Sequence, residues 1–212
     1  LGTNGFLQHL KPDALWIDCS TLNPTFVKEI SQHAQDNNIR YLEAPVAGTK
    51  PQAEAGSLIF FVGGHSGHMV EVDTYLQMMG QKSIHIGEVG KASSLKLVVN
   101  LMLATSMATF AEGIAFGEAL GISQEQLFNV LIGGPVTPPY LASKRGKLEK
   151  QDYSPQFPLK WMHKDLQMVA LAAYENDVPM PLAHATKELY AQAIKSGHGD
   201  QDLAAIYEYL SG

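Results

Sequence analysis

A lysine and an asparagine stand four residues apart in a segment that is otherwise apolar. The stretch GEVGKASSLKLVVN, residues 87–100, places Lys96 and Asn100 in the first turns of an expected helix. Residues at positions i and i+4 lie one turn apart on one helix face. If that face lines a cleft between the two halves of the chain, Lys96 could act as a general acid, because partial burial lowers the pKa of an ammonium group. Asn100 could then bind the same substrate oxygen. Pattern alone favours the alternative, in which Lys96 extends into water and Asn100 contacts a neighbouring loop.

Two expected strands end in polar residues. The loop EAPVAGT follows one of them, and ligands of open α/β sheets bind outside the carboxyl ends of strands. Ala47, Gly48 and Thr49 would present backbone N–H groups to a carboxylate there, although an ordinary turn that needs Gly48 for its backbone angle is the alternative. The other strand ends in DCST, residues 18–21. Its hydroxyl groups could contact a cofactor or cap the next helix, and capping is the simpler explanation.

The remaining candidate motifs are weaker. FPLKWMHKDLQM, residues 157–168, places Lys160 and Lys164 on one helix face, which is usually a solvated arrangement. HSGH, residues 65–68, has no acidic or cysteine partner at ligand spacing, so we expect no metal site. Cys19 lies in an apolar run, which disfavours a nucleophilic role. The sequence contains no GxSxG, P-loop, CxxC or GxGxxG motif.

Composition narrows the class of protein. The chain has 212 residues, 45% of them hydrophobic, which suits a protein with a sizeable core in one or two domains. The net charge of −6 gives no reason to expect a nucleic acid or an anionic membrane as partner. One cysteine excludes an internal disulfide and fits a reducing compartment, so we expect a cytoplasmic protein. We also expect no membrane span.

The first 90 residues alternate between strand and helix patterns. Strands are expected in ALWIDCS, IRYLEAPV, LIFFVGG and SIHIG, with a loop in AGTKPQAEAGS. Helices are expected in NPTFVKEISQHAQDNN, where Asn23 would be the N-cap and Pro24 the first helical residue, and in HMVEVDTYLQMMG. This alternation predicts an α/β unit with a mostly parallel sheet covered by helices.

After residue 90 only helices are expected. Residues 92–120 form one long helix pattern that is apolar on nearly all sides, which indicates the centre of a helical domain or a subunit interface. Ser123 and Gln126 form a capping box for the next helix. Further helices are expected near 138–149, 158–177, 181–196 and 201–210. We therefore expect an α/β domain over residues 1–91 and an all-α domain over residues 92–212.

Taken in order, the motifs resemble one family along nearly the whole chain. DCST, APVAGTKPQAEAGSL, GxVGxxxxxKLxxN and FPLxxxxKDL resemble the β-hydroxyacid dehydrogenases, and within them the glyoxylate/succinic semialdehyde reductases. The resemblance implies a Rossmann domain, a long connecting helix and an all-α domain for substrate binding and dimerisation. The match begins after the first Rossmann strands. We therefore expect the N-terminal part of that domain, with its dinucleotide fingerprint, to be missing.

The resemblance also assigns roles to individual residues. Lys96 matches the catalytic lysine that protonates the carbonyl oxygen, and Asn100 matches the residue that orients the substrate. Gly48 and Thr49 lie in the loop that binds the substrate carboxylate. Ala47 replaces a serine that is usual in the family. If that hydroxyl binds a charged group, its loss would cost roughly 1.5–3 kcal/mol of binding.

Four further positions match the family site. Thr21 and Lys164 match cofactor-contacting positions, and Phe157 and Asp165 match positions that line the closed site. No position matches a metal ligand.

The function expected from the resemblance is the reduction of small aldehyde- or keto-acids. Succinic semialdehyde and glyoxylate are the expected substrates, with NADP(H) preferred and NAD(H) also acceptable. 3-Hydroxyisobutyrate and tartronate semialdehyde remain alternatives on the same fold. A non-catalytic binding or scaffold homologue is a further alternative, against which the retained Lys96 counts. The chain could also be an inactive fragment. A homodimer or homotetramer is expected, because the apolar helix needs a partner surface.

Overall fold

The computed structural model describes residues 5–211, and the chain divides into two compact units. The first contains the residues up to Val99 together with Leu171–Asp177. The second contains Asn100–Ala170 and the residues from Val178 onward. Two helices, α4 (Lys91–Ala119) and α7 (Leu159–Glu175), contribute residues to both units.

The first unit is built on a five-stranded sheet. Its strands are β1 (Leu15–Asp18), β2 (Arg40–Glu43), β3 (Val46–Ala47), β4 (Leu58–Gly63) and β5 (Gly80–Gly87). The four expected strands are all present, and the second of them is divided into β2 and β3. Both pieces pair with β4, and the Phe61 N–H donates to the Pro45 carbonyl (2.9 Å) across the interruption.

The sheet is mixed, whereas the sequence pattern predicted a mostly parallel one. β1 pairs with β2 in parallel, and β4 pairs with β5 in parallel. β4 runs antiparallel to both β2 and β3. The connection from β3 to β4 contains only the short helix α2 (Lys50–Glu54). A parallel pairing needs a crossover of a dozen or more residues, so this connection returns the chain in the opposite direction.

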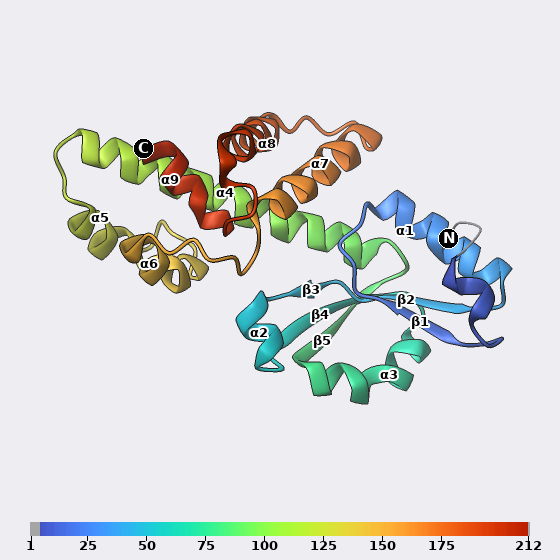
Figure 1. Cartoon of the computed structure of the whole chain (residues 1–212). Coiled ribbons are helices and arrows are strands. Elements are labelled where there is room, and N and C mark those ends of the chain that lie inside the picture. Colours follow the sequence, from blue (N-terminus) through green and yellow to red (C-terminus); the bar gives the residue numbers. More distant parts are fainter. Residues whose placement is uncertain (1–4, 212) are drawn as a thin grey trace. The chain divides into compact units, whose positions relative to one another are not determined.

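Helices α1 (Pro24–Asp36) and α3 (Ser66–Met79) cover opposite faces of the sheet (Figure 1). Val27 and Ile30 of α1 belong to the same buried cluster as Tyr41. Val72 and Leu76 of α3 cluster with other sheet residues, including Leu42, the neighbour of Tyr41 in β2. Successive residues of a strand point to opposite faces, which places the two helices on two sides.

The helix starts follow local capping chemistry. The Asn23 side chain accepts hydrogen bonds from the Thr25 N–H (2.8 Å) and the Phe26 N–H (3.3 Å), as expected for the N-cap of α1. α2 forms where a loop was expected. Its start is stabilised by Gln52, whose Oε1 accepts from the Thr49 N–H (2.9 Å) and hydroxyl (3.0 Å). Five helical residues are too few to give a periodic sequence pattern.

The second unit is helical. After α4 come α5 (Gln124–Leu131), α6 (Tyr140–Lys150), α7 and α8 (Pro181–Ala193), then the π-helix η2 (Ile194–His198), the 3-10 helix η3 (Leu203–Ala205) and α9 (Ile206–Ser211). A second 3-10 helix, η1 (Phe6–His9), precedes β1 in the first unit. The capping box between Ser123 and Gln126 is confirmed at the start of α5.

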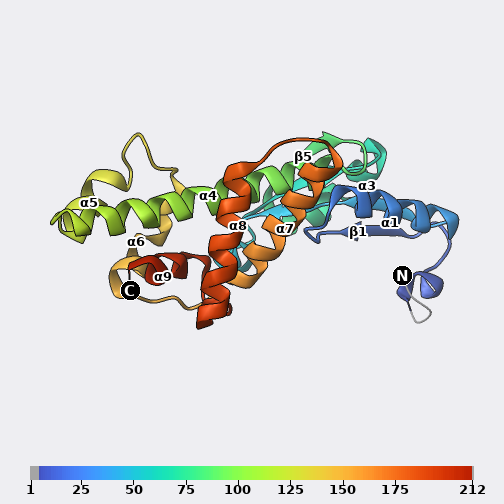
Figure 2. The same cartoon turned by 90° about the horizontal axis from the view of Figure 1, so that it is seen from above.

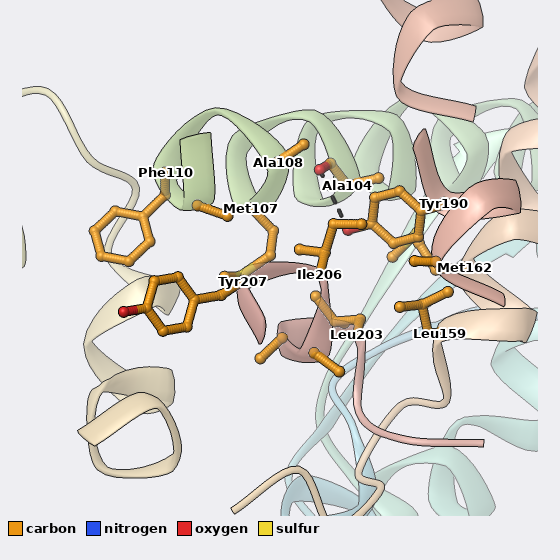
Figure 3. Packing of buried hydrophobic residues seen from close by; sticks show 14 of the residues in the cluster. Ala104, Met107, Ala108, Phe110, Leu159, Met162, Tyr190, Leu203, Ile206 and Tyr207 are labelled. Atoms are coloured by element: carbon orange, nitrogen blue, oxygen red, sulfur yellow. Dashed lines mark hydrogen bonds between the residues drawn. The ribbon is translucent and has the colours of Figure 1, made fainter. Parts of the chain in front are cut away.

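The core of the second unit lies between α4 and the last helices. Met107 of α4 packs among Tyr190, Ile206 and other buried residues (Figure 3). α8 crosses α4 (Figure 2), and there the Tyr190 hydroxyl donates to the Ala104 carbonyl (3.4 Å). Burial raises the pKa of Tyr190 well above its ordinary value, so the phenol stays neutral in this core.

The long helix α4 is buried on part of its surface and exposed on the rest within this single chain, and a subunit interface was one of the two expectations for it. Val98, Met102 and Phe116 of this helix are 56–67% exposed. Among the described residues, α4 is also the one helix long and apolar enough to cross a membrane, where none was expected. Length and composition are weak evidence, because the core helix of a globular protein passes the same test. Several residues of α4 lie in the hydrophobic core of the second unit, including Met107.

Candidate functional site

Lys96 and Asn100 lie one turn apart on the same face of α4, and both are buried. Lys96 is 8% exposed and Asn100 is 1% exposed. The alternative in which Lys96 extends into water is therefore not what the structure shows. Asn100 contacts a side chain of another helix rather than a loop, which also differs from the simpler expectation.

The Asn100 amide is oriented by a carboxylate of α7. Its Nδ2 donates to Asp165 Oδ2 (2.6 Å), and Asp165 is 3% exposed. A carboxylate only accepts hydrogen bonds, so the NH₂ group must face Asp165, and the amide oxygen faces the other way. Asn100 Oδ1 is buried and has no hydrogen-bond partner in the described structure. A buried acceptor without a partner costs about 1–3 kcal/mol, which a ligand hydroxyl or ammonium group would offset.

Lys164, expected to contact the cofactor, contacts Asp165. Its Nζ lies 3.0 Å from Asp165 Oδ1, and its side chain is 40% exposed. Lys160, one turn earlier, instead pairs with exposed Asp200 and lies over the Trp161 ring, 5.4 Å from its centroid. The two lysines therefore have different environments despite their shared spacing.

A residue that the sequence analysis did not single out, Glu43, binds the start of α4. Its Oε1 accepts from the Gly90 N–H (2.6 Å) and the Ala92 N–H (3.1 Å). Its Oε2 accepts from the Ser93 N–H (3.1 Å) and from the Ser93 hydroxyl. Glu43 and Ser93 are each 1% exposed. A negative charge at a helix N-terminus is stabilised by the unpaired N–H groups and the helix dipole.

Two glycines make this arrangement sterically accessible. A Cβ atom at Gly63, which pairs with Glu43 across the sheet, would lie 2.2 Å from Glu43 Oε1. Gly90 adopts a φ of +94°, which favours glycine. Glu43 could have been recognised from the sequence, because it is the one charged residue in the otherwise apolar strand segment YLEAPV and a buried charge requires partners.

In the loop expected to bind a carboxylate, at least one of the three backbone N–H groups already has a hydrogen-bond partner within the chain. Ala47 pairs with Ile59 of β4. The N–H of Thr49 is bonded to Gln52, so one of the three expected donors is already used. Gly48 has a φ of +119°, and an added Cβ atom would lie 2.9 Å from Leu58 Cδ2, which confirms that the turn itself needs glycine.

The tip of β1 is organised by Asp18. Its Oδ1 accepts from the Ser20 N–H (2.9 Å), and its Oδ2 accepts from the Tyr41 hydroxyl (3.2 Å). The expectation that the hydroxyls of this tip, including that of Thr21, cap the next helix is wrong, because Asn23 makes that cap. Burial, and then the negative charge of Asp18, raises the pKa of the Cys19 thiol. Cys19 is therefore disfavoured as a thiolate nucleophile, in line with the sequence interpretation.

Phe157 lies in a loop that a buried ion pair holds in place. Asp202, which is fully buried, accepts from the Phe157 N–H (3.2 Å) and from Lys144 Nζ (2.7 Å). The Leu203 N–H donates to the Phe157 carbonyl (2.9 Å). These bonds fix the backbone immediately before α7, the helix that carries Asp165.

One of the two histidines of HSGH, His65, has a structural role. His65 Nδ1 accepts from the Gly67 N–H (3.2 Å) and caps α3. The His65 and His68 rings lie 5.2 Å apart. Within residues 5–211 no group of three or more histidine, cysteine, aspartate or glutamate side chains could hold a metal ion.

The chain supplies part of what a nicotinamide dinucleotide requires. Residues at the carboxyl end of β1, where Thr21 lies, occupy the edge at which such sheets bind nucleotides. The glycine-rich turn that would hold the pyrophosphate is absent from the sequence. The residues at this edge therefore lie where such a sheet places a nucleotide, and the sequence has no GxGxxG turn beside them.

Two family models of known proteins match the chain, and together they cover nearly all of it. The family model for the NAD-binding domain of 6-phosphogluconate dehydrogenase matches residues 1–87. The model for the NAD-binding domain of NADP-dependent 3-hydroxyisobutyrate dehydrogenase matches residues 90–210. Both models describe NAD-binding domains of dehydrogenases.

Individual proteins similar to this chain indicate the family to which it belongs. The chain is 32% identical to glyoxylate/succinic semialdehyde reductase 1 of Arabidopsis thaliana, over 96% of this chain and 71% of that protein. It is 32% identical to the human cytokine-like nuclear factor N-PAC, over 98% of this chain but only 37% of that protein. The solved 3-hydroxyisobutyrate dehydrogenase of Mycobacterium tuberculosis superimposes with a TM-score of 0.83 at 29% identity, over 97% of this chain and 73% of that one. The chain belongs to the β-hydroxyacid dehydrogenase family.

Proposed function

We propose that this chain carries the proton-donating and substrate-binding residues of a reductase that acts on small aldehyde- or keto-acids. Succinic semialdehyde, reduced to 4-hydroxybutyrate, and glyoxylate, reduced to glycolate, are the proposed substrates, with NADPH as the preferred reductant. The observation that carries the proposal is the buried Lys96 one turn from Asn100, whose amide Asp165 orients. The 32% identity to glyoxylate/succinic semialdehyde reductase 1 of Arabidopsis thaliana supports this choice of substrates.

In this mechanism the reduced nicotinamide, when bound, supplies a hydride to the carbonyl carbon. Lys96 Nζ donates a hydrogen bond to the carbonyl oxygen and then the proton that converts the alkoxide to an alcohol. Asn100 Oδ1 accepts a hydrogen bond from the resulting hydroxyl group, because its NH₂ side is held by Asp165. Both groups sit on one helix face, so a single rigid element sets their spacing.

The remaining proposed roles concern binding. Ala47 and Gly48 are proposed to bind the substrate carboxylate through the backbone, with Thr49 shaping the loop through Gln52. Phe157 is proposed to line the substrate site. Thr21 and Lys164 are proposed to contact the cofactor. The domain over residues 1–91 would serve the cofactor, and residues 92–212 would serve the substrate and a partner subunit.

A non-catalytic function is the second candidate. It is favoured by the N-PAC relatives, which are named nuclear factors rather than enzymes. The chain spans 37% of the length of the human N-PAC protein. We therefore propose an activity for the whole protein and do not take it from these relatives. The two candidates differ in one prediction: only the enzyme uses Lys96 for turnover.

The test is an assay of NADPH oxidation with both aldehyde-acids. It uses this chain alone and a fusion that adds a family-typical N-terminal Rossmann segment. Lys96→Ala is compared with Lys91→Ala, an exposed lysine on the same helix. We expect turnover in the fusion that is lost only in Lys96→Ala. If the fusion binds NADPH but reduces no member of a panel that adds the semialdehydes of 3-hydroxyisobutyrate and tartronate, the non-catalytic alternative is supported.

A further inference from the structure

We propose that Glu43 is a positioning residue for Lys96. Its buried carboxylate fixes the first turn of α4, the turn over which the lysine side chain extends. The inference rests on the proposed reductase function and adds a residue that does not touch the substrate.

The geometry links the two residues through one helical turn. Glu43 binds the N–H groups of Gly90, Ala92 and Ser93, which all lie at the start of α4. Lys96 follows Ser93 by three residues and Ala92 by four, so it lies on the same helix face. Side chains of a helix lean toward its N-terminus. The lysine stem therefore extends back over the turn that Glu43 holds, and any shift of this turn moves Nζ.

A carboxylate meets the requirements of this turn better than a neutral side chain. Four donors converge on Glu43, three from the backbone and one from the Ser93 hydroxyl. Both of its oxygens only accept, whereas a glutamine would turn an NH₂ group toward backbone N–H groups. Glu43→Gln therefore keeps the size of the side chain but loses part of the contact.

Holding a helix end does not by itself require a buried charge. α1 and α5 are capped by Asn23 and Ser123, which precede their helices in the chain. Glu43 instead reaches α4 from a strand 47 residues away in sequence, and burying its charge has a large desolvation cost. Unlike a local cap, Glu43 fixes the start of α4 relative to β2. A proton donor on α4 needs such a fixed position, because the donor must stay close to the atom that it protonates.

The test uses two variants that disturb the contact in different ways. Glu43→Gln changes the acceptor. Gly63→Ala leaves Glu43 in place but adds a Cβ atom that would lie 2.2 Å from its Oε1. Their matched controls are Ser123→Ala, which removes a cap from a helix without site residues, and Gly113→Ala. Gly113 lies on α4, and a Cβ atom there meets nothing within 4 Å.

The first readout is steady-state kinetics of the fusion described above, with NADPH and succinic semialdehyde. We expect both test variants to lower kcat by about 10- to 100-fold while KM changes less than about two-fold, because a small misplacement of a proton donor affects the chemical step. Both controls should keep the parent kcat. A folded Glu43→Gln variant with the parent kcat, in a fusion that Lys96→Ala inactivates, would overturn the inference and leave the proposed function intact.

The second readout does not depend on activity. Lysines of the chain are reductively methylated with ¹³C, and the Lys96 signal is assigned by its loss in Lys96→Arg. We expect this signal to shift in Glu43→Gln and Gly63→Ala and to keep its position in Ser123→Ala. If the parent fusion reduces no member of the substrate panel described above, the proposed function fails, and an unshifted Lys96 signal in both test variants would then overturn the positioning role as well.

Discussion

At the scale of single residues, the candidate site depends on which polar groups are buried and which partners they have. Lys96 and Asn100 could be recognised from the sequence, because polar residues in an apolar helix need an explanation. The orientation of the Asn100 amide could not, since it depends on Asp165, 65 residues away. Glu43 was missed for the same reason: its donors lie 47–50 residues away.

Replacing Asp165 by asparagine should impair catalysis through Asn100. The new amide can present either its oxygen or its NH₂ group, so the orientation of the Asn100 amide is no longer fixed. Hydrogen bonds to charged groups contribute about 1.5–3 kcal/mol, so we expect kcat/KM to fall by roughly 10- to 100-fold. The measurement is steady-state kinetics of the fusion. Asp177→Asn, at an exposed position whose φ of +53° asparagine tolerates, is the control and should behave like the parent.

The Cys19 thiol should react slowly at neutral pH. Its pKa is raised by partial burial and then by the charge of Asp18, so the thiolate fraction at neutral pH is smaller than that of an unshifted cysteine, although the residue is exposed. Asp18→Asn removes the negative charge, which lowers this pKa and should shift the pH profile of the alkylation rate to lower pH. Iodoacetamide labelling followed by mass spectrometry measures the rate. A Cys19 that reacts at pH 7 as fast as free cysteine would contradict this account.

At the scale of elements, the strands and long helices followed from periodicity and capping residues. Asn23 and Ser123 mark the starts of α1 and α5, and the structure confirms both. The antiparallel direction of β4 was not predictable from local pattern, because the strand alternation is the same in either direction. α2 was missed because its stabilising contact, from Gln52 to Thr49, lies inside a stretch rich in loop-forming residues.

The loop before α7 should depend strongly on the buried pair of Lys144 and Asp202. Lys144 is 5% exposed at its side chain and Asp202 is 0% exposed, and removing one partner leaves an uncompensated buried charge. We expect Lys144→Met to lower the free energy of unfolding by about 3–5 kcal/mol. Urea titration would follow Trp161 fluorescence in a Trp16→Phe background, so that the signal reports the second unit.

The control for this prediction is an exposed pair on the same unit. Lys160 and Asp200 are 44% and 88% exposed at their side chains. Lys160→Met should change the free energy of unfolding by less than about 0.5 kcal/mol. Equal losses in the free energy of unfolding for Lys144→Met and Lys160→Met would contradict the prediction that the buried pair contributes more to stability than the exposed one.

At the scale of the whole molecule, the exposed apolar face of α4 points to self-association. Met102 and Phe116 are 61% and 67% exposed on a helix that is otherwise largely apolar. We propose that this face belongs to a homodimer or homotetramer interface, and that Phe116→Glu weakens it by placing a charge there. Sedimentation velocity over a concentration series is the measurement. Val70→Glu, at a 77% exposed position on α3, is the control, and a parent chain that stays monomeric throughout would contradict the proposal.

We propose that Lys96 donates the proton in the reduction of an aldehyde-acid. The most direct test is a single-turnover measurement of NADPH oxidation by the fusion with succinic semialdehyde, together with the dissociation constant for NADPH. General acid catalysis contributes about 10²- to 10⁴-fold, so Lys96→Ala should slow the single turnover by that factor while NADPH binding stays unchanged. A Lys96→Ala protein that oxidises NADPH at a rate close to that of the parent would contradict the account.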